Sequence, residues 1–150
     1  RTSAQPEINV LYEDDAIWVI DKPAGIAVEP ERWDREGAHI AGAVLDHLER
    51  GLGEGQRLPF RPRVVHRIDK GTSGVLCFAK HLEAERALRQ QFEEGTVGKR
   101  YLAIVDGEVP PEGGTVDLPI GPDAKKDGRM RVDRSGTGKR AHTRYELARA

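Results

Sequence analysis

The sequence has little cysteine, few aromatic residues and no long apolar run. Its 150 residues include a single cysteine, Cys77, which excludes an internal disulfide framework and favours a reducing, cytoplasmic location. No stretch approaches the length of a membrane-spanning helix, and the amino terminus lacks the pattern of a signal peptide. The length and the moderate apolar content suit one compact domain over residues 1–150.

Several motifs of cofactor and metal chemistry are also missing. The chain has neither the glycine-rich phosphate loop of nucleotide hydrolases nor the GxGxxG pattern of dinucleotide binding. Its histidines, at positions 39, 47, 66, 81 and 142, lack the spacing of zinc ligands. Cys77 lies in an apolar run, which favours an inert buried thiol over a nucleophile.

The net charge of −1 conceals a strong asymmetry along the chain. Residues 1–56 carry five Lys or Arg against 12 Asp or Glu, whereas residues 57–80 carry six against one. A local basic block can attract a polyanion even when the whole molecule is close to neutral. On charge alone, a solvated basic loop is an equally good interpretation of residues 57–80.

Apolar runs separated by turn residues predict short strands around two helices. Strands are expected at residues 8–12, 16–21, 64–65, 75–79, 97–105, 115–120, 129–132 and 143–148. Helices are expected at residues 36–50 and 82–94, ending at Gly51 and Gly95. This order favours an α+β fold with a mixed, mainly antiparallel sheet over a doubly wound α/β sheet. Because the last expected strand ends without a turn or tail, and because residue 1 is Arg rather than Met, we expect a piece of a longer domain that is incomplete at its C-terminal end.

The run VVHRIDKGTSG, residues 64–74, places four titratable side chains where a strand gives way to a turn: His66, Arg67, Asp69 and Lys70. An aspartate at this position commonly forms an Asx-turn with its own backbone, and the residues alone favour that structural interpretation. The alternative is catalytic, because a carboxylate beside an arginine stays ionised and can act as a nucleophile or a base. The surrounding basic side chains would suit a phosphodiester substrate.

Five segments in order resemble the catalytic domain of the RluA family of RNA pseudouridine synthases. They are INVLYEDDAIWVIDKPAG, RPRVVHRIDKGTSGVLCFAK, QQFEEGTVGKRYLAIVDGEV, GGTVDLPIG and the Lys-Arg-Ala-x-Thr-x-Tyr pattern at 139–145. The resemblance covers nearly the whole chain. Ile68 stands where the family has leucine, and Gly71 stands where it usually has aspartate. The family continues into a Thr-Gly-Arg-x-His-Gln-Ile-Arg segment, which normally supplies a basic partner for the aspartate and which this chain does not contain.

The resemblance implies the isomerisation of uridine to pseudouridine in RNA, without a cofactor or a metal. Asp69 would be the catalytic carboxylate, and attack on the sugar, addition to the base and proton abstraction from the ribose all remain open for it. Tyr101 would stack on the uracil ring. A base buried in an RNA helix must be flipped out before a side chain can reach it, and Arg67 would fill the space that the base vacates.

The remaining basic residues of the motifs are implied to bind or shape the RNA site. His66 is expected to shape the turn rather than to react. The candidates for contacts with RNA phosphates are Lys22, Arg61, Arg63 and Lys70.

Two other function classes compete with the isomerase. The first is an RNA-binding module of the same fold without turnover, but such a module has no need for Asp69, which would repel phosphate. The second is a hydrolase that uses Asp69, which fits poorly because no second carboxylate or metal ligand accompanies it. Ribosomal and transfer RNA both remain possible substrates. We expect a monomeric full-length protein without a membrane partner, and little or no activity from residues 1–150 alone.

Overall fold

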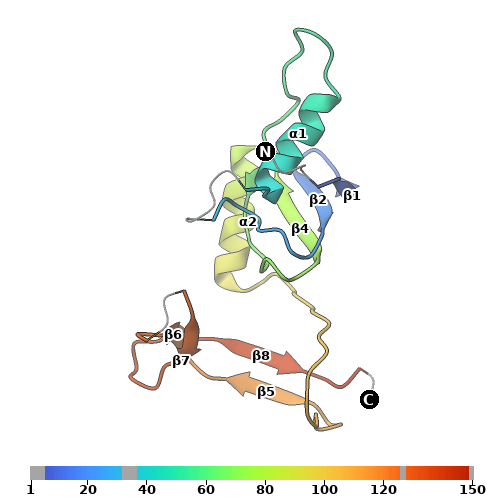
Figure 1. Ribbon diagram of the computed structural model, residues 1–150. Helices are drawn as coiled ribbons and strands as arrows, with labels where there is room; N and C mark the ends of the chain where they lie inside the picture. The colour runs from blue at the N-terminus through green and yellow to red at the C-terminus, as the bar shows by residue number, and fades with distance from the viewer. Residues whose placement is uncertain (1–5, 32–36, 126–127, 149–150) are drawn as a thin grey trace. The chain divides into compact units, whose positions relative to one another are not determined.

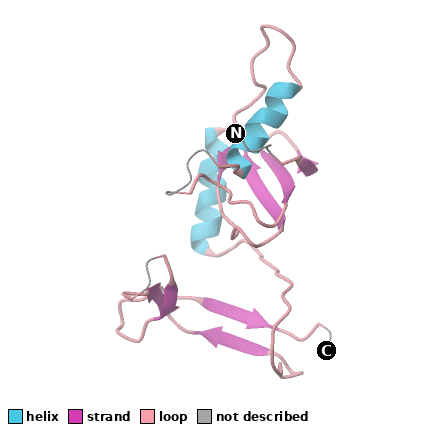
Figure 2. Ribbon diagram, viewed as in Figure 1, coloured by secondary structure: helices cyan, strands magenta, loops and turns pink. Residues whose placement is uncertain are grey.

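The structure is a computed structural model that describes residues 6–31, 37–125 and 128–148. The chain divides into two compact units, Arg1–Arg100 and Tyr101–Ala150, and each is described by itself. Figure 1 shows the elements of both units, and Figure 2 distinguishes their helices, strands and loops. Within the described residues, no helix combines the length and the apolar character that crossing a membrane requires.

The first unit is built on a four-stranded antiparallel sheet in the order β1-β2-β4-β3. Its elements are β1 (Asn9–Glu13), β2 (Ile17–Lys22), α1 (Ile40–Arg50), β3 (Arg63–Val64), β4 (Gly74–Ala79) and α2 (Leu82–Glu94). In the central pair, Ile17 lies opposite Ala79 and Lys22 lies opposite Gly74. The loop from β3 to β4 therefore reaches the sheet at the end where β2 finishes.

The main core lies between one face of the sheet and α1. Side chains alternate across a strand, so every second residue of β2 and β4 points to this face. The buried residues that meet there are Ile8, Trp18, Ile20, Val28, Ile40, Ala43, Val44, Leu76 and Phe78. The helix presents its apolar side to the sheet because its buried residues recur at helical spacing.

A smaller cluster packs α2 against the opposite face of the sheet. Ala84 of the helix meets Val65 and Ala79, with Leu88 and Phe92 alongside them. The helix is well terminated: the side chain of His81 accepts a hydrogen bond from the Ala84 amide at 3.2 Å, and Gly95 adopts the left-handed conformation with φ 71°. A residue with a β-carbon would be strained at that cap.

The second unit contains two small antiparallel sheets. One pairs β5 (Gly114–Asp117) with β8 (His142–Tyr145), and the other pairs β6 (Ile120–Pro122) with β7 (Met130–Val132). Ile120 and Lys139 exchange backbone hydrogen bonds of 2.9 and 2.8 Å, which join the start of β6 to the chain that leads to β8.

The α+β class, the antiparallel pairing and both helices are confirmed, with α2 at the predicted bounds. The strand predicted at 97–105 is wrong: the chain there has no regular structure, and Leu102 and Ile104 are 89% and 103% exposed. Alternating apolar residues form a strand only when a second strand satisfies their backbone groups, and residues 97–105 pair with no strand in the described part of the chain.

Three smaller predictions also need correction. The strand expected at 115–120 is divided into β5 and β6. The continuous apolar run of residues 75–79 predicts a strand that is buried throughout, but Val75 is 64% exposed, because α2 covers only the far end of that face. The helix expected from residue 36 begins at Ile40, and residue 36 itself lies outside the described residues.

Candidate active site

Asp69 lies in the loop between β3 and β4, with an exposed side chain. The turn after it is closed by the backbone, since the Thr72 amide donates to the Asp69 carbonyl at 3.0 Å. Among residues 6–31, 37–125 and 128–148, the Asp69 carboxylate makes neither a hydrogen bond nor an ion pair. The Asx-turn that the residues alone favour is therefore not formed, and the carboxylate faces solvent at the end of the sheet.

Lys22 lies beneath this loop with its side chain fully buried. Its ammonium donates to the carbonyls of Pro23 at 2.9 Å, Ile26 at 2.7 Å and Lys70 at 3.3 Å. Burial lowers the pKa of Lys22, and the negative charge of Asp69 opposes that shift. This cation ties the Lys-Pro-Ala-Gly turn to the turn that carries Asp69, together with the Gly25 amide, which donates to the same Lys70 carbonyl at 2.7 Å.

Lys22 does not fit the predicted role of a direct phosphate contact. A phosphate can reach only an exposed cation, whereas this ammonium is buried and already donates to three carbonyls. The sequence suggested a surface contact because lysine is almost never fully buried without partners. The partners here are backbone carbonyls, which no residue pattern reveals.

His66 connects the same loop to β4 and to α2. Its Nε2 accepts a hydrogen bond from the Cys77 amide at 3.0 Å, and its ring stacks on Phe92 with centroids 4.6 Å apart. Strand β3 ends at Val64 and does not reach Cys77 of β4. The imidazole therefore accepts the hydrogen bond that a backbone carbonyl of a longer β3 would have accepted from the Cys77 amide. The expected role of His66 in shaping the turn fits this geometry.

We expect His66 to make the stability of the protein depend on pH. Burial, and then the charge of Lys99, lower the pKa of the imidazole. An unfolded histidine has a pKa of about 6.5. As the pH falls, His66 therefore takes up a proton in the unfolded chain before it does so in the folded protein. The contribution of His66 to stability is fully present above about pH 6.5 and is lost as the pH falls toward the lower pKa of the folded state. Lowering the pH from about 7.5 to 5.5 should therefore reduce the free energy of unfolding by about 1 kcal/mol, because the protonated ring loses this one hydrogen bond.

The measurement is the free energy of unfolding of the intact protein at both pH values. The His66→Gln variant should lose this part of the pH dependence, whereas the His47→Gln variant should keep it. An unchanged pH dependence in the His66→Gln variant would contradict the assignment.

Three other predicted RNA-binding residues engage in ion pairs. Arg63 contacts Glu85 of α2 at 3.0 Å, a pair that helps to hold β3 against that helix. Beside Asp69, Arg67 lies 3.9 Å from Glu29, and Lys70 lies 2.6 Å from Glu31. The sequence does not predict these two acidic partners, because its only signal for them is the acidic character of the N-terminal segment.

Cys77 behaves as the sequence predicts for an unreactive thiol. It is half-buried in β4, and burial, followed by the negative charge of Asp14, raises the pKa of the thiol. A thiol with a raised pKa stays protonated at neutral pH and is a weak nucleophile.

Two further predicted site residues are Tyr101 and Arg61. Tyr101 begins the second unit and is 61% exposed. Arg61 is an exposed residue of the segment that leads into β3. Within the described residues, no group of three or more His, Cys, Asp or Glu side chains could hold a metal ion.

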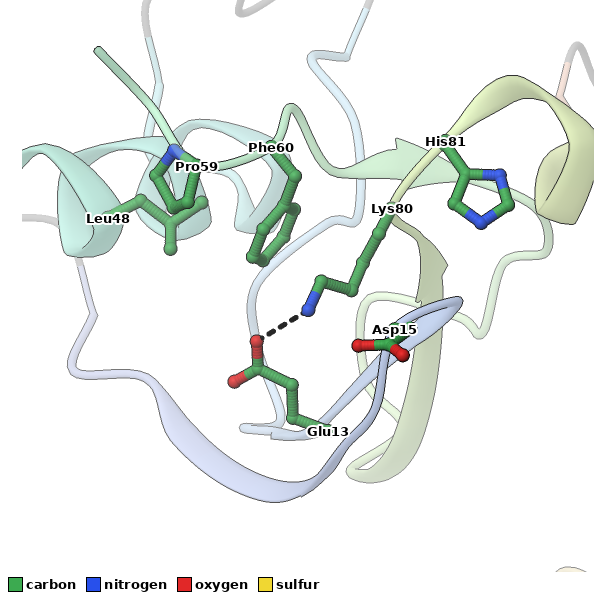
Figure 3. Close-up of a pocket in the computed structure, with 7 residues that line it drawn as sticks. All are labelled: Glu13, Asp15, Leu48, Pro59, Phe60, Lys80 and His81. Atoms are coloured by element: carbon green, nitrogen blue, oxygen red, sulfur yellow. Dashed lines mark hydrogen bonds and ion pairs between the residues drawn. The ribbon is translucent and has the colours of Figure 1, made fainter.

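An open hollow of about 420 Å³ lies at the other end of the sheet (Figure 3). It is lined by Glu13, Asp15, Leu48, Pro59, Phe60, Lys80 and His81. Lys80 bonds to Glu13 at 2.8 Å and lies 4.5 Å from the centre of the Phe60 ring. Asp69 precedes Gly74 and the hollow follows Ala79, at opposite ends of β4, so this hollow is separate from Asp69.

Comparison with known proteins identifies the family. The sequence profile that matches residues 16–150 describes the RNA pseudouridylate synthases. The chain belongs to this family. The predicted membership of the RluA family is confirmed, since relatives include the ribosomal large subunit pseudouridine synthases D of Xylella fastidiosa and Pseudomonas aeruginosa, which are 39% and 38% identical.

The alignments cover most of this chain but only part of each relative. They span 98% of the chain and 43% of the Xylella protein, and 92% of the chain and 41% of the Pseudomonas protein. The chain thus spans less than half the length of these curated pseudouridine synthases.

Solved structures of the family share the fold. Human RNA pseudouridylate synthase domain containing 4 aligns with a TM-score of 0.63 at 23% identity, over 93% of this chain and 53% of the human one. Human RNA pseudouridylate synthase domain containing 1 aligns with a TM-score of 0.61 at 22% identity, over 92% of this chain and 49% of the human one. The predicted pseudouridine synthase fold is confirmed.

Proposed function

We propose that the intact protein isomerises uridines to pseudouridine in RNA and that Asp69 is its catalytic carboxylate. The reaction breaks the bond from N1 of uracil to C1′ of the ribose and forms a bond from C5 to the same carbon. The proton on C5 leaves and N1 gains one, so the atoms balance without an oxidant, a reductant or a group donor. An ionised carboxylate can serve such a rearrangement as a nucleophile or as a base.

The observation that supports this proposal best is the arrangement around Asp69. Its exposed carboxylate stands on a turn that Lys22 and the backbone hold in place, with Arg67 and Lys70 on either side. The flanking cations favour the approach of a phosphate backbone. The family membership supports the same assignment.

Base flipping belongs to the same proposal. Arg67 is 70% exposed, and its contact with Glu29 is long at 3.9 Å, so little holds the guanidinium in its present position. A planar guanidinium can stack in the space left by a flipped uracil, which offsets part of the few kcal/mol that unstacking costs.

Large-subunit ribosomal RNA is the substrate class that we propose over transfer RNA. The relatives from Xylella and Pseudomonas carry this specificity in their names. The test is to incubate the intact protein with RNA that carries tritium at C5 of uridine, and to follow the release of tritium into water. Release from large-subunit ribosomal RNA but not from transfer RNA supports the proposal, and the reverse preference would replace ribosomal with transfer RNA.

Tyr101→Ala should reduce turnover by about a hundredfold or more while RNA affinity changes by less than about threefold. The physical reason is that one stacked ring orients one flipped base, whereas phosphate contacts supply most of the affinity. The measurement is kcat by tritium release beside Kd by filter binding, with Tyr12→Ala of β1 as the matched control. Equal losses of turnover and affinity would mark Tyr101 as a structural residue instead.

The alternative function is an RNA-binding module without turnover. It predicts that the intact protein binds large-subunit ribosomal RNA and releases no tritium from it under any condition that leaves the protein folded. The exposed carboxylate of Asp69 argues against this module, because a negative charge between two cations weakens the attraction of phosphate.

A further inference from the structure

The segment that follows the Lys-Pro-Ala-Gly turn, residues 26–31, is held firmly beside the Asp69 loop. Ala27 and Val28 are buried, with 9% and 1% of their surface exposed. Their carbonyls accept hydrogen bonds of 2.9 Å from the amides of Ile40 and Ala41, at the start of α1. These contacts fix the point from which the next side chains extend.

Two of those side chains are carboxylates, and both meet the cations that flank Asp69. Glu31 lies 2.6 Å from the ammonium of Lys70, and its side chain is only 21% exposed. Glu29 lies 3.9 Å from the guanidinium of Arg67, with both side chains largely exposed. The first pair is therefore close and partly shielded from water, and the second is loose.

A carboxylate offers a lysine or an arginine the same charged oxygen acceptors that a phosphate offers. RNA cannot bind Lys70 fully while Glu31 occupies its ammonium. Ion pairs near the surface are weak, about 0 to 1 kcal/mol, so Glu31 can be displaced by an RNA that fits the site.

We propose that Glu31, assisted by Glu29, determines RNA specificity by occupying Lys70 and Arg67 until a fitting RNA displaces the two carboxylates. This inference rests on the proposed RNA substrate. RNA releases counterions only where a protein cation neutralises one of its phosphates, so an RNA that leaves Lys70 paired with Glu31 gains nothing from Lys70. A substrate RNA breaks the pair and gains the contact.

The test compares Glu31→Gln with Glu13→Gln in the intact protein. Glu13 pairs with Lys80 at 2.8 Å at the other end of the sheet, so each variant removes one negative charge and one Lys–Glu pair. The probe is an RNA hairpin without uridine, which cannot be a substrate, and Kd is measured between about 50 and 200 mM salt.

Glu31→Gln should bind this hairpin about threefold to tenfold more tightly at low salt, with a salt dependence steeper by about one phosphate contact. Glu13→Gln should change the affinity by less than about twofold, because its lysine lies away from Asp69. Equal effects of the two variants would overturn the inference while leaving the proposed enzyme intact. If the unaltered protein binds no RNA at all, the proposed function and this inference are both overturned.

A second comparison separates local competition from general charge. In a Lys70→Gln background the added Glu31→Gln change should leave the Kd of the hairpin unaltered, because the cation for which it competes is gone. Tighter binding in that background would show that Glu31 acts by long-range repulsion of RNA, and would overturn the inference.

Discussion

Asp69→Asn in the intact protein should lower pseudouridine formation at least about a thousandfold while RNA affinity stays equal or rises slightly. The amide has nearly the shape of the carboxylate but is neither a nucleophile nor a base at neutral pH. It also carries no charge, so the phosphate backbone meets less repulsion between Arg67 and Lys70. The measurements are tritium release and Kd on the same RNA.

The matched control is Asp15→Asn. Asp15 is also exposed, but it lies in the turn between β1 and β2, at the end of the sheet away from Asp69. This variant should retain full turnover. Appreciable product from a clean Asp69→Asn preparation would disprove the catalytic assignment, and a folded Asp69→Asn protein that no longer binds RNA would make Asp69 a structural residue.

Lys22→Met should lower kcat by about a hundredfold with little change in KM, and should reduce the free energy of unfolding by about 1 to 3 kcal/mol. Methionine fills a similar volume but donates no hydrogen bond, so the carbonyls of Pro23 and Ile26 lose this donor. The Lys70 carbonyl keeps only the Gly25 amide, which donates to it at 2.7 Å. The connection between the two turns is then weakened, so Asp69 loses part of its support and a nearby positive charge. KM changes little because Lys22 is buried and does not contact the substrate.

Lys80→Met serves as the control for this variant. Lys80 also donates to a backbone carbonyl, that of Asp14 at 2.7 Å, and pairs with Glu13, but it does so at the distant end of the sheet. The Lys80→Met variant should have a lower free energy of unfolding and an unchanged kcat. A Lys22→Met protein with normal kcat would show that Lys22 contributes only to folding.

The sequence predicted best where local chemistry decides the structure. Helix α2 has its predicted bounds because a side-chain cap at His81 and a left-handed glycine at Gly95 determine where it starts and stops. The antiparallel strands β2 and β4 were also predicted, since turn residues and apolar runs mark them. Asp69 was predicted to lie close to a strand end, but it lies in the loop between β3 and β4, beyond the end of β3 at Val64.

The sequence predicted worst where distant residues decide. Lys70 and Glu31 are separated by 39 positions, and their pairing depends on how α1 anchors the segment before Glu31. Lys22 is buried because a turn 48 residues away supplies one of its acceptors. The apolar alternation of residues 97–105 predicts which side chains would share a face of a strand. It does not predict whether a partner strand is present to form the backbone hydrogen bonds of a sheet.

The imidazole of His66 also has a consequence for solubility. Strand β3 covers only two residues of β4, so the remaining backbone amides of β4 on that side would form an open edge to which another molecule could add a strand. His66 satisfies the Cys77 amide with a side chain, and its ring, stacked on Phe92, stands where an incoming strand would lie. The residue that shapes the turn of Asp69 thereby also leaves less of this edge open to strand addition, which disfavours aggregation.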